Sequence, residues 1–390
     1  MYMSIGKIVF SFSLTILFSF QGMSQIKPFR TLYDSTSQLT IYLYQKTDTV
    51  FQKKTKQKIV QSDTLCTYSS PETSQQRLLG VHMRYTYGAK TLHGICNLPL
   101  LIQTSLFKKE IDTLEKKDNF FQTQKPYTIP TITDIQLWQF FLKPISDCEG
   151  GLFRGLNTYD PVGFSFGFLQ FAANGRGKDS TFAEYFRQVL ISPKGHALFP
   201  NLTITDKYRQ FRDTVSRRMY RTSDFMPRPN EARPHPLRQL LNPDSSRIDD
   251  KELINAAKFL YLVDSDTSFR TIQVRLAIKW AKQILNSYWS KSQEAGFSAL
   301  DINGQSFKVC IVLVDLIHHG RARFEDIQKV LSQPQADEQT MINKLLALDT
   351  NDSGKRAKEL KLALQKLNMP AITGLVCIRK EGDWVFEKKK

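Results

Sequence analysis

The sequence is poor in the residues that build disulfide frameworks and metal centres. Its 390 residues include five cysteines and six histidines. An odd number of cysteines leaves at least one thiol free, and only Cys66 and Cys96 are candidates to pair within the N-terminal region. The histidines lack metal-ligand spacing, because adjacent His318 and His319 would point about 100° apart on a helix. We therefore expect neither a metal nor an organic cofactor.

Long apolar runs and nucleophile elbows are also missing. Beyond residue 24 no run approaches the roughly 18 apolar residues of a membrane span, so we expect no stable membrane insertion. No Gly-x-Ser-x-Gly elbow surrounds a serine, which argues against a serine-hydrolase triad of Ser306, His318 and Asp315. We therefore expect neither a membrane-spanning protein nor a serine hydrolase.

The N-terminus is typical of an export signal. Lys7 precedes the apolar run Ile8–Phe20, and small residues follow in Gly22–Ser24. The run is too short to span a bilayer comfortably, which favours cleavage over a retained anchor. We expect residues 1–24 to be a signal peptide and the mature protein to be secreted or periplasmic.

Acidic residues are in the minority, with 37 Asp and Glu against 54 Lys and Arg and a formal net charge of +17. A basic protein attracts polyanions. The sequence shows no interleaved basic and aromatic pattern of an RNA-binding module, so we expect no nucleic-acid partner. For an exported protein, anionic polymers of the cell envelope are the more accessible partners.

The chain divides by pattern into regions. In residues 25–128, stretches such as Leu39–Gln45 and Gly80–Gly88 alternate apolar and polar side chains, which predicts a small β-rich or α+β accessory module of unknown role. Residues 204–248 form a Pro- and Arg-rich insertion, expected to begin as an amphipathic helix and to continue as a loop. Residues 371–390 are predicted to form a C-terminal hairpin with its turn at Glu381–Gly382 and a basic tail.

From Asp249 to the C-terminal hairpin, the sequence is mostly helical by its periodicity. Four stretches have apolar residues at spacings of three and four, which predicts helices. These stretches are Lys251–Asp264, Phe269–Trp289, Ser306–Gly320 and Glu338–Asp349.

The segment Asp147–Ala172 carries the most chemistry. Glu149 closes an apolar-periodic stretch and precedes two glycines, which are typical of a helix end. A polar turn with a second carboxylate, Asp160, follows. Cleavage of a glycosidic bond needs one protonated carboxyl and a second group that stabilises or attacks the anomeric carbon or activates water.

Glu149–Gln170 resembles the catalytic segment of the lysozyme-like superfamily, especially goose-type lysozymes, lytic transglycosylases and related chitosanases. In that group a catalytic Glu ends a helix, a small hairpin carries polar or acidic groups, and a Ser-x-Gly-x-x-Gln signature follows. The matching residues are Glu149, Asp160, Ser165, Gly167 and Gln170. The resemblance implies an α+β fold: a mostly α, two-lobed catalytic domain over residues 129–370 with a small β-hairpin, preceded by the small β-rich module.

This chain departs from the family pattern in two respects. Gly-Phe-Leu-Gln replaces the usual Gly-Leu-Met-Gln, and a long stretch separates the hairpin from the helical lobe, so the chain would be a divergent member. The second acid is ambiguous, because lytic transglycosylases work with one Glu whereas hydrolytic members add an Asp. Asp160 is the better placed candidate and Asp179 the weaker one.

The resemblance implies that Glu149 is the general acid and Asp160 the general base or electrostatic stabiliser. To hold a proton near neutrality, Glu149 needs a raised pKa, which burial against aromatic neighbours such as Phe166 would provide. Tyr159 and Gln170 would hydrogen-bond sugar hydroxyls or the N-acetyl group, beside Ser165 and Gly167 of the signature.

Each of these residues also has a plainer interpretation. Glu149 could be a surface acid at a helix end, and Asp160 before Pro161 an ordinary turn residue. The phenylalanines could form core, and Gly167 could only permit close packing.

Together these observations predict a secreted glycan-cleaving enzyme, either a muramidase-like glycoside hydrolase or a lytic transglycosylase. The expected partner is peptidoglycan or a related amino-sugar polysaccharide, cut between N-acetylmuramic acid and N-acetylglucosamine. One alternative is a chitosanase-like hydrolase, although a basic protein suits cationic chitosan poorly. Another is an inactive envelope-binding protein on a lysozyme-like scaffold. A buried, proton-holding Glu149 would favour catalysis, and an exposed one the scaffold.

Overall fold

The structure, a computed structural model, describes most of the chain after the N-terminus. It covers residues 26–389 apart from 53–56, 104, 115–133, 161–162, 174–180, 205–210, 214–218, 221–235, 295–301, 333–336, 350–353 and 368–369. The predicted signal peptide, Asp179 and much of the Pro- and Arg-rich insertion lie outside these residues.

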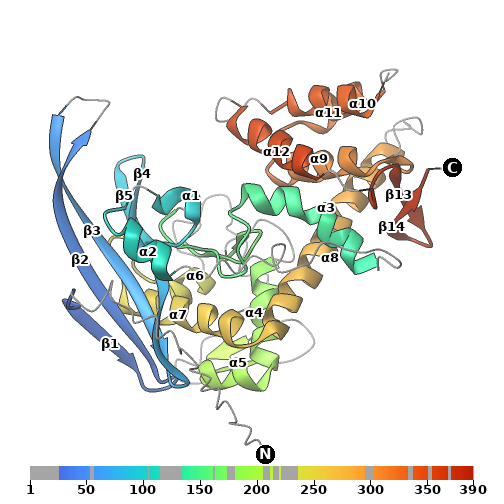
Figure 1. The fold of residues 1–390 in the computed structure, drawn as a ribbon. Coiled ribbons are helices and arrows are strands. Elements are labelled where there is room, and N and C mark those ends of the chain that lie inside the picture. Colours follow the sequence, from blue (N-terminus) through green and yellow to red (C-terminus); the bar gives the residue numbers. More distant parts are fainter. Residues whose placement is uncertain are drawn as a thin grey trace, which may run out of the picture.

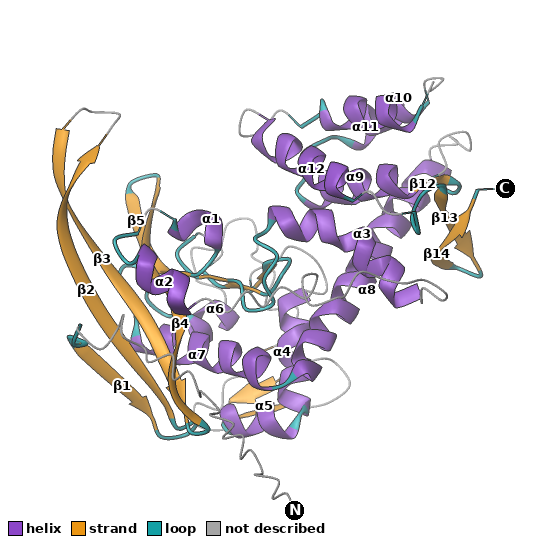
Figure 2. Cartoon of the chain, viewed as in Figure 1, coloured by secondary structure: helices purple, strands orange, loops and turns teal. Residues whose placement is uncertain are grey.

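A large antiparallel sheet dominates one side of the molecule (Figures 1 and 2). Its first five strands are β1 (Arg30–Asp34), β2 (Leu39–Gln52), β3 (Gln57–Ser70), β4 (Thr73–Tyr87) and β5 (Lys90–Cys96). Three short strands from the candidate motif continue it, namely β6 (Leu156–Asn157), β7 (Ser165–Phe166) and β8 (Phe171–Ala172). The eight strands follow one another in chain order across the sheet.

The expectation of a small N-terminal module ahead of a mostly α, two-lobed domain with its own hairpin is therefore wrong. The hairpin is the continuation of the N-terminal sheet, because β6 pairs with the end of β5 through Cys96 and Asn157. Just beyond this pair, Thr158 donates its backbone N–H to the Ile95 carbonyl at 3.0 Å. An edge strand carries unpaired backbone groups that such pairing satisfies. Local alternation identifies strands but does not indicate which edges meet.

Side chains of the sheet alternate between two apolar layers, as expected for a period of two. On one face Leu39, Ile41 and Leu43 join the main core. On the other face Tyr44 and Leu78 belong to a smaller cluster, which also contains residues of α1 (Pro99–Ile102) and α2 (Lys108–Leu114). The sheet is thus buried on both faces over this part of its length.

Helices pack on the main-core side and extend away from the sheet (Figure 1). They are α3 (Asp134–Cys148), α4 (Thr181–Ile191), α5 (Pro193–Leu198), α6 (Pro236–Leu241), α7 (Asp250–Ser265), α8 (Thr267–Glu294), α9 (Phe307–His318), α10 (Phe324–Leu331), α11 (Glu338–Leu346) and α12 (Lys355–Lys366). The four helices predicted from periodicity are confirmed as α7, α8, α9 and α11. Helices α5, α6, α10 and α12 were not predicted, and α6 lies where the insertion was expected to be a loop.

Two smaller sheets complete the fold. Strands β9 (Leu202–Ile204), β10 (Phe211–Asp213) and β11 (Met219–Tyr220) form one of them. The expectation of an amphipathic helix at the start of the insertion is therefore wrong, because β10 and β11 lie there.

The other small sheet closes the chain and contains β12 (Gln305–Ser306), β13 (Leu375–Lys380) and β14 (Asp383–Lys388). The predicted C-terminal hairpin is confirmed. Its turn residues Glu381 and Gly382 both have positive φ, 49° and 85°, which matches a two-residue hairpin turn.

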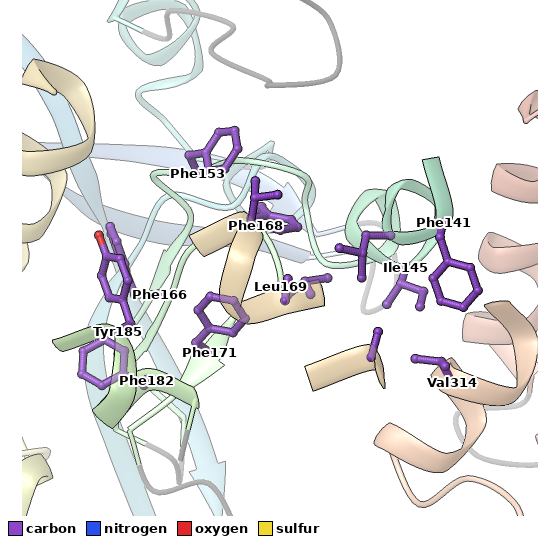
Figure 3. Close-up of a cluster of buried hydrophobic side chains, with 14 of the residues drawn as sticks. Phe141, Ile145, Phe153, Phe166, Phe168, Leu169, Phe171, Phe182, Tyr185 and Val314 are labelled. Atoms are coloured by element: carbon purple, nitrogen blue, oxygen red, sulfur yellow. The ribbon is translucent and has the colours of Figure 1, made fainter. Parts of the chain in front are cut away.

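The aromatic run of the motif lies in the main core. Phe166 of β7 and Phe182 of α4 each place a ring 5.4 Å from the ring of Phe259 on α7. Figure 3 shows Phe166, Phe182 and Tyr185 gathered at one end of this core, with Phe141 and Val314 at the other. The core interpretation of the phenylalanines is therefore correct, and their packing joins the sheet to the helices.

The structure excludes the disulfide expected between Cys66 and Cys96. Cys66 on β3 and Cys96 on β5 are separated by β4, which contributes Gly80 and Val81 opposite them. Two strand spacings amount to about 9.6 Å, beyond the roughly 7 Å limit between Cα atoms for a disulfide. The proposed pairing is wrong, and all five cysteines are free thiols.

Within the described residues, no helix combines the length and apolarity needed to cross a membrane.

A fully buried carboxyl fixes α7 to the sheet. Glu252, in the first turn of α7, accepts hydrogen bonds from the Ile95 backbone N–H at 3.2 Å and from the Thr158 hydroxyl. Its other oxygen accepts from the Asp249 N–H at 3.3 Å, which completes a capping box. Burial raises the pKa of Glu252 to about 8, although these hydrogen bonds lower it in part.

This pKa makes stability depend on pH. In the unfolded chain this carboxyl loses its proton near the ordinary pKa of 4.5, whereas in the folded protein it keeps the proton to higher pH. The protonated carboxyl therefore stabilises the fold fully below pH 4.5. This stabilisation should decline as pH rises from about 4.5 to about 8. We predict that the free energy of unfolding of the native chain falls by a few kcal/mol relative to Glu252→Gln over this window, at about 1.4 kcal/mol per pKa unit. Urea unfolding at a series of pH values measures the difference, and a difference that does not vary with pH would contradict the prediction.

Candidate functional site

Glu149 stands at the end of α3, as the sequence predicted. Its backbone N–H donates to the Ser146 carbonyl at 2.9 Å, in the last turn of the helix. Gly150 and Gly151 then adopt positive φ values of 96° and 67°, which side chains disfavour. The two glycines stop the helix and turn the chain toward β6.

The Glu149 carboxylate belongs to a network of ionisable side chains at or next to three helices. Arg356 of α12 donates from Nη1 to Glu149 Oε1 at 2.8 Å and from Nη2 to Asp315 Oδ1 at 2.5 Å. His319, which follows α9, places Nε2 3.2 Å from Glu149 Oε1 and 3.7 Å from Asp315 Oδ1. The same guanidinium also reaches the Ile145 carbonyl at 3.5 Å. Arg356 therefore links α3, α9 and α12.

Burial within this network is uneven. The side chains of Asp315 and Arg356 are 2% and 7% exposed, whereas that of Glu149 is 19% exposed. A buried carboxylate is tolerated only when it is paired and hydrogen-bonded, which explains why Asp315 lies against the guanidinium. Of the two acids, Glu149 is the one that solvent can reach.

The expectation of a raised pKa at Glu149 is wrong. Burial raises the pKa, but the His319 ring nitrogen 3.2 Å away and the positive charge of Arg356 outweigh it and leave the pKa below its usual range. The phenylalanines expected to desolvate Glu149 lie in the core instead, where Phe153, Phe164 and Phe166 are almost fully buried. In the resting protein Glu149 is a carboxylate at neutral pH.

Neighbouring His318 is neutral at neutral pH. Burial lowers its pKa to about 4, and its ring meets that of Trp280 edge-on at 4.4 Å. Its packing role is therefore distinct from the polar role of His319.

Asp160 caps the turn between β6 and β7. Its Oδ2 accepts from Asn157 Nδ2 at 3.0 Å, and its Oδ1 accepts from the Gly163 N–H at 3.1 Å. This is the geometry of a turn residue, the plainer of its two interpretations. The side chain remains half-buried, so the carboxylate also borders solvent.

The two acids flank the end of β5. A side chain at Gly150 would come within 3.2 Å of the Leu98 side chain, so the segment after Glu149 packs closely against Leu98. Leu98 in turn donates its N–H to the Cys96 sulfur at 3.4 Å. Burial and the negative charge of Asp160 both contribute to a raised pKa of the Cys96 thiol, which places Asp160 near the same strand end. The fold thus gathers both ends of the motif around residues 96–98.

Tyr159 and Gln170 remain at the border of the core. Tyr159 is half-buried, meets Tyr85 edge-on at 6.4 Å, and has its pKa raised to about 12, chiefly by burial. Gln170 adopts a left-handed φ of 49° and donates from Nε2 to the Gly167 carbonyl at 3.0 Å. Among the described residues, its Oε1 is buried without a partner.

Ser165 and Gly167 face the core rather than an open surface. Ser165 is 5% exposed and pairs with Asn157 and Ala172 in the sheet. Gly167 has a φ of 87°, and a Cβ there would lie 2.5 Å from Gln273 Oε1 of α8. The close-packing interpretation is correct for Gly167, because this glycine lets α8 approach the motif.

Sequence reasoning missed the partners of Glu149. Arg356 and His319 are 207 and 170 positions away along the chain, and nothing in their local sequence marks them. Asp315 did carry a signal, since an acid inside the apolar run Val309–Ile317 requires a buried partner.

Within the described residues, no three His, Cys, Asp or Glu side chains gather in a metal-binding arrangement. No family model, no curated protein and no solved structure matches this chain.

We predict that Arg356→Met destabilises the fold by about 3–5 kcal/mol at neutral pH, because it leaves two carboxylates without their buried partner. The loss should shrink as pH falls, since Glu149 then takes up a proton and no longer needs the guanidinium. Denaturant unfolding at pH 7 and pH 4 measures the loss. Lys355→Met, at a neighbouring side chain that is 76% exposed, is the matched control and should change little. Equal losses in the two variants would contradict this role of Arg356.

Proposed function

We propose that this protein is an exported glycan-cleaving enzyme that acts on peptidoglycan, with Glu149 as the proton donor to the leaving oxygen. One observation carries the proposal: Glu149 ends α3 where the chain turns into β6–β8, and its carboxylate keeps partial contact with solvent. The resemblance to lysozyme-like enzymes lies in this junction of a helix-ending Glu with a hairpin.

The proton must be placed on Glu149 before it can be donated. Arg356 and His319 favour the carboxylate, so the acid form is populated at acidic pH or when a bound substrate displaces these partners. Protonated Glu149 would donate to the glycosidic oxygen as the bond to the anomeric carbon breaks. Asp160, held by Asn157 and Gly163, would stabilise the developing positive charge or activate the attacking water.

Charge favours peptidoglycan over chitosan as the substrate. The chain carries a formal net charge of +17, which attracts an anionic polymer and repels a cationic one. A chitosanase-like activity therefore remains the weaker enzymatic alternative.

A second candidate function is binding without cleavage, on the same scaffold. It is favoured by the ion pair that keeps Glu149 ionised and by the two hydrogen bonds that tie Asp160 into its turn. In that case Glu149 would serve mainly to hold α3 against α9 and α12.

Digestion of purified peptidoglycan, with fragments read by mass spectrometry, separates the two functions. We predict that the mature chain releases muropeptides and that Glu149→Gln lowers release by at least about 100-fold, as expected for loss of a general acid. Asp147→Asn is the matched control at the same helix end, where its carboxylate pairs with Lys143 at 2.8 Å. Reducing or anhydro ends of the products would distinguish hydrolysis from lytic cleavage.

Muropeptides released equally by Glu149→Gln would exclude Glu149 as the acid. No release from the native chain, with chitosan also uncut, would overturn the enzymatic proposal in favour of the binding function.

The ion pair predicts how activity depends on pH. A general acid loses activity as pH rises through its pKa, and removing the positive charge of Arg356 should raise the pKa of Glu149. We therefore predict that Arg356→Gln moves the alkaline limb of the pH–rate profile to higher pH by about one unit or more. Release of dye from labelled peptidoglycan measures the profile, with Lys355→Gln as control. A limb that stays in place, or moves to lower pH, would contradict the proposed role of Glu149.

A further inference from the structure

A second site candidate lies at the other end of the large sheet from Glu149. A cavity of about 360 Å³ opens between the turn that joins β3 to β4, the last turn of α7 and helix α5. Its lining consists of Tyr68, Ser69, Ser70, Glu72, Thr73, Gln75, Arg77, Lys194, Tyr261 and Ser265. Figure 1 places α5 and the β3–β4 turn at the bottom of the view, whereas α3 lies at mid-height and α12 above it.

Every side chain of this lining carries a polar group. Six of the ten side chains carry a hydroxyl group, three are charged, one is an amide, and none is aliphatic. Some of these groups already have partners, because Tyr68 donates to Asp264 and Ser265 donates to the Tyr261 carbonyl. The charged side chains and the remaining polar groups suit a ligand rich in hydrogen-bonding groups, such as a peptide backbone or a hydroxylated chain.

Behind the cavity wall, one carboxylate is shared by two guanidinium groups. Asp264 Oδ2 lies 3.2 Å from Arg77 Nη1 and 3.9 Å from Arg154 Nη1. The Tyr68 hydroxyl donates to the same oxygen at 2.5 Å. Within the described residues, Arg77 Nε is buried without a partner. The two arginines therefore exceed the negative charge that the fold supplies to them.

At the cavity rim the charges have opposite signs. Lys194 Nζ lies 4.6 Å from the centre of the Tyr261 ring, and the Tyr261 hydroxyl donates to Glu72. Lys194 also acts on the carboxylate of Asp266, so the free donor of this group within the described residues is the unpartnered Arg77 Nε, which shares Asp264 with Arg154. A ligand carboxylate could accept from Arg77, while Glu72 could pair with a ligand ammonium group.

We propose that this cavity binds the peptide part of peptidoglycan, a short peptide with free carboxylate and ammonium groups. This inference rests on the proposed function for its polymer, but not on Glu149. The carboxylate would lie at Arg77 and Lys194, and the ammonium group at Glu72. The Thr73 hydroxyl and the Gln75 amide would take up peptide N–H and carbonyl groups. Because the cavity is remote from α3, it would anchor the polymer while the glycan strand is cut elsewhere.

Isothermal titration calorimetry on the full mature chain carrying Glu149→Gln tests the site without cleavage of the ligand. The probes are a disaccharide–tetrapeptide, the isolated tetrapeptide, and a neutral tetramer of N-acetylglucosamine. We expect the tetrapeptide and the disaccharide–tetrapeptide to bind with similar affinity. Adding Lys194→Gln, or Glu72→Gln, should weaken both by about tenfold, as expected when one charge-assisted hydrogen bond is lost.

Lys251→Gln is the matched control, because Lys251 is exposed on α7 at the end far from the cavity. It should leave the affinity unchanged, and thermal unfolding of each variant checks that the fold is kept. Equal binding of the tetrapeptide by the Lys194→Gln and control proteins would overturn the proposed site. So would a lack of tetrapeptide binding, whether or not the sugar tetramer binds.

The outcomes also separate this site from the proposed function. Tetrapeptide binding without any cleavage by the native chain would leave the cavity in place and remove the enzymatic proposal. Cleavage that depends on Glu149, with no tetrapeptide binding, would support the enzymatic proposal and overturn the cavity as a peptide site.

Discussion

The pairing of residues 156–158 with the end of β5 is the contact on which the rest of this structure depends. It merges the candidate motif with the N-terminal sheet through the Cys96–Asn157 pair and through reciprocal hydrogen bonds between Ile95 and Thr158. Glu252 adds α7 to the same junction, because its buried carboxyl accepts from both Ile95 and Thr158. One short seam thus positions the sheet, the motif and the first long helix.

This seam explains why the aromatic run after Asp160 forms core. Once β6–β8 join the sheet, their inner face lies against α4 and α7, where Phe166 and Phe182 pack on Phe259. Gly167 then lets α8 approach closely enough for the Gln273 amide to donate to the Phe153 carbonyl at 3.0 Å. The residues that most resemble a catalytic signature therefore contribute as much to packing as to a site. Asp160, Tyr159 and Gln170 are the members of the motif that stay at its border.

Glu149 is held by an ion pair rather than by strand pairing. A carboxylate that is largely covered needs a partner, and Arg356 supplies it from a helix near the end of the chain. The same guanidinium neutralises Asp315, so the ion pair that lowers the pKa of Glu149 also fastens α3 to α9 and α12. Stability and the ionisation of Glu149 are coupled through one side chain. The lining of the polar cavity at Arg77 and Lys194 includes none of these side chains.

The sequence by itself determined the elements whose signals are local. Apolar spacing gave α7, α8, α9 and α11, alternation gave β2 to β4, and paired glycines or a Glu–Gly turn marked the end of α3 and the C-terminal hairpin. Only the tertiary structure decided how these elements meet. Whether β6 joins β5, whether Cys66 can reach Cys96, and whether Glu149 holds a proton all depend on residues far apart along the chain. Strand pairing and burial of charge are set by long-range contacts, to which the short-range periodicity of a sequence is blind.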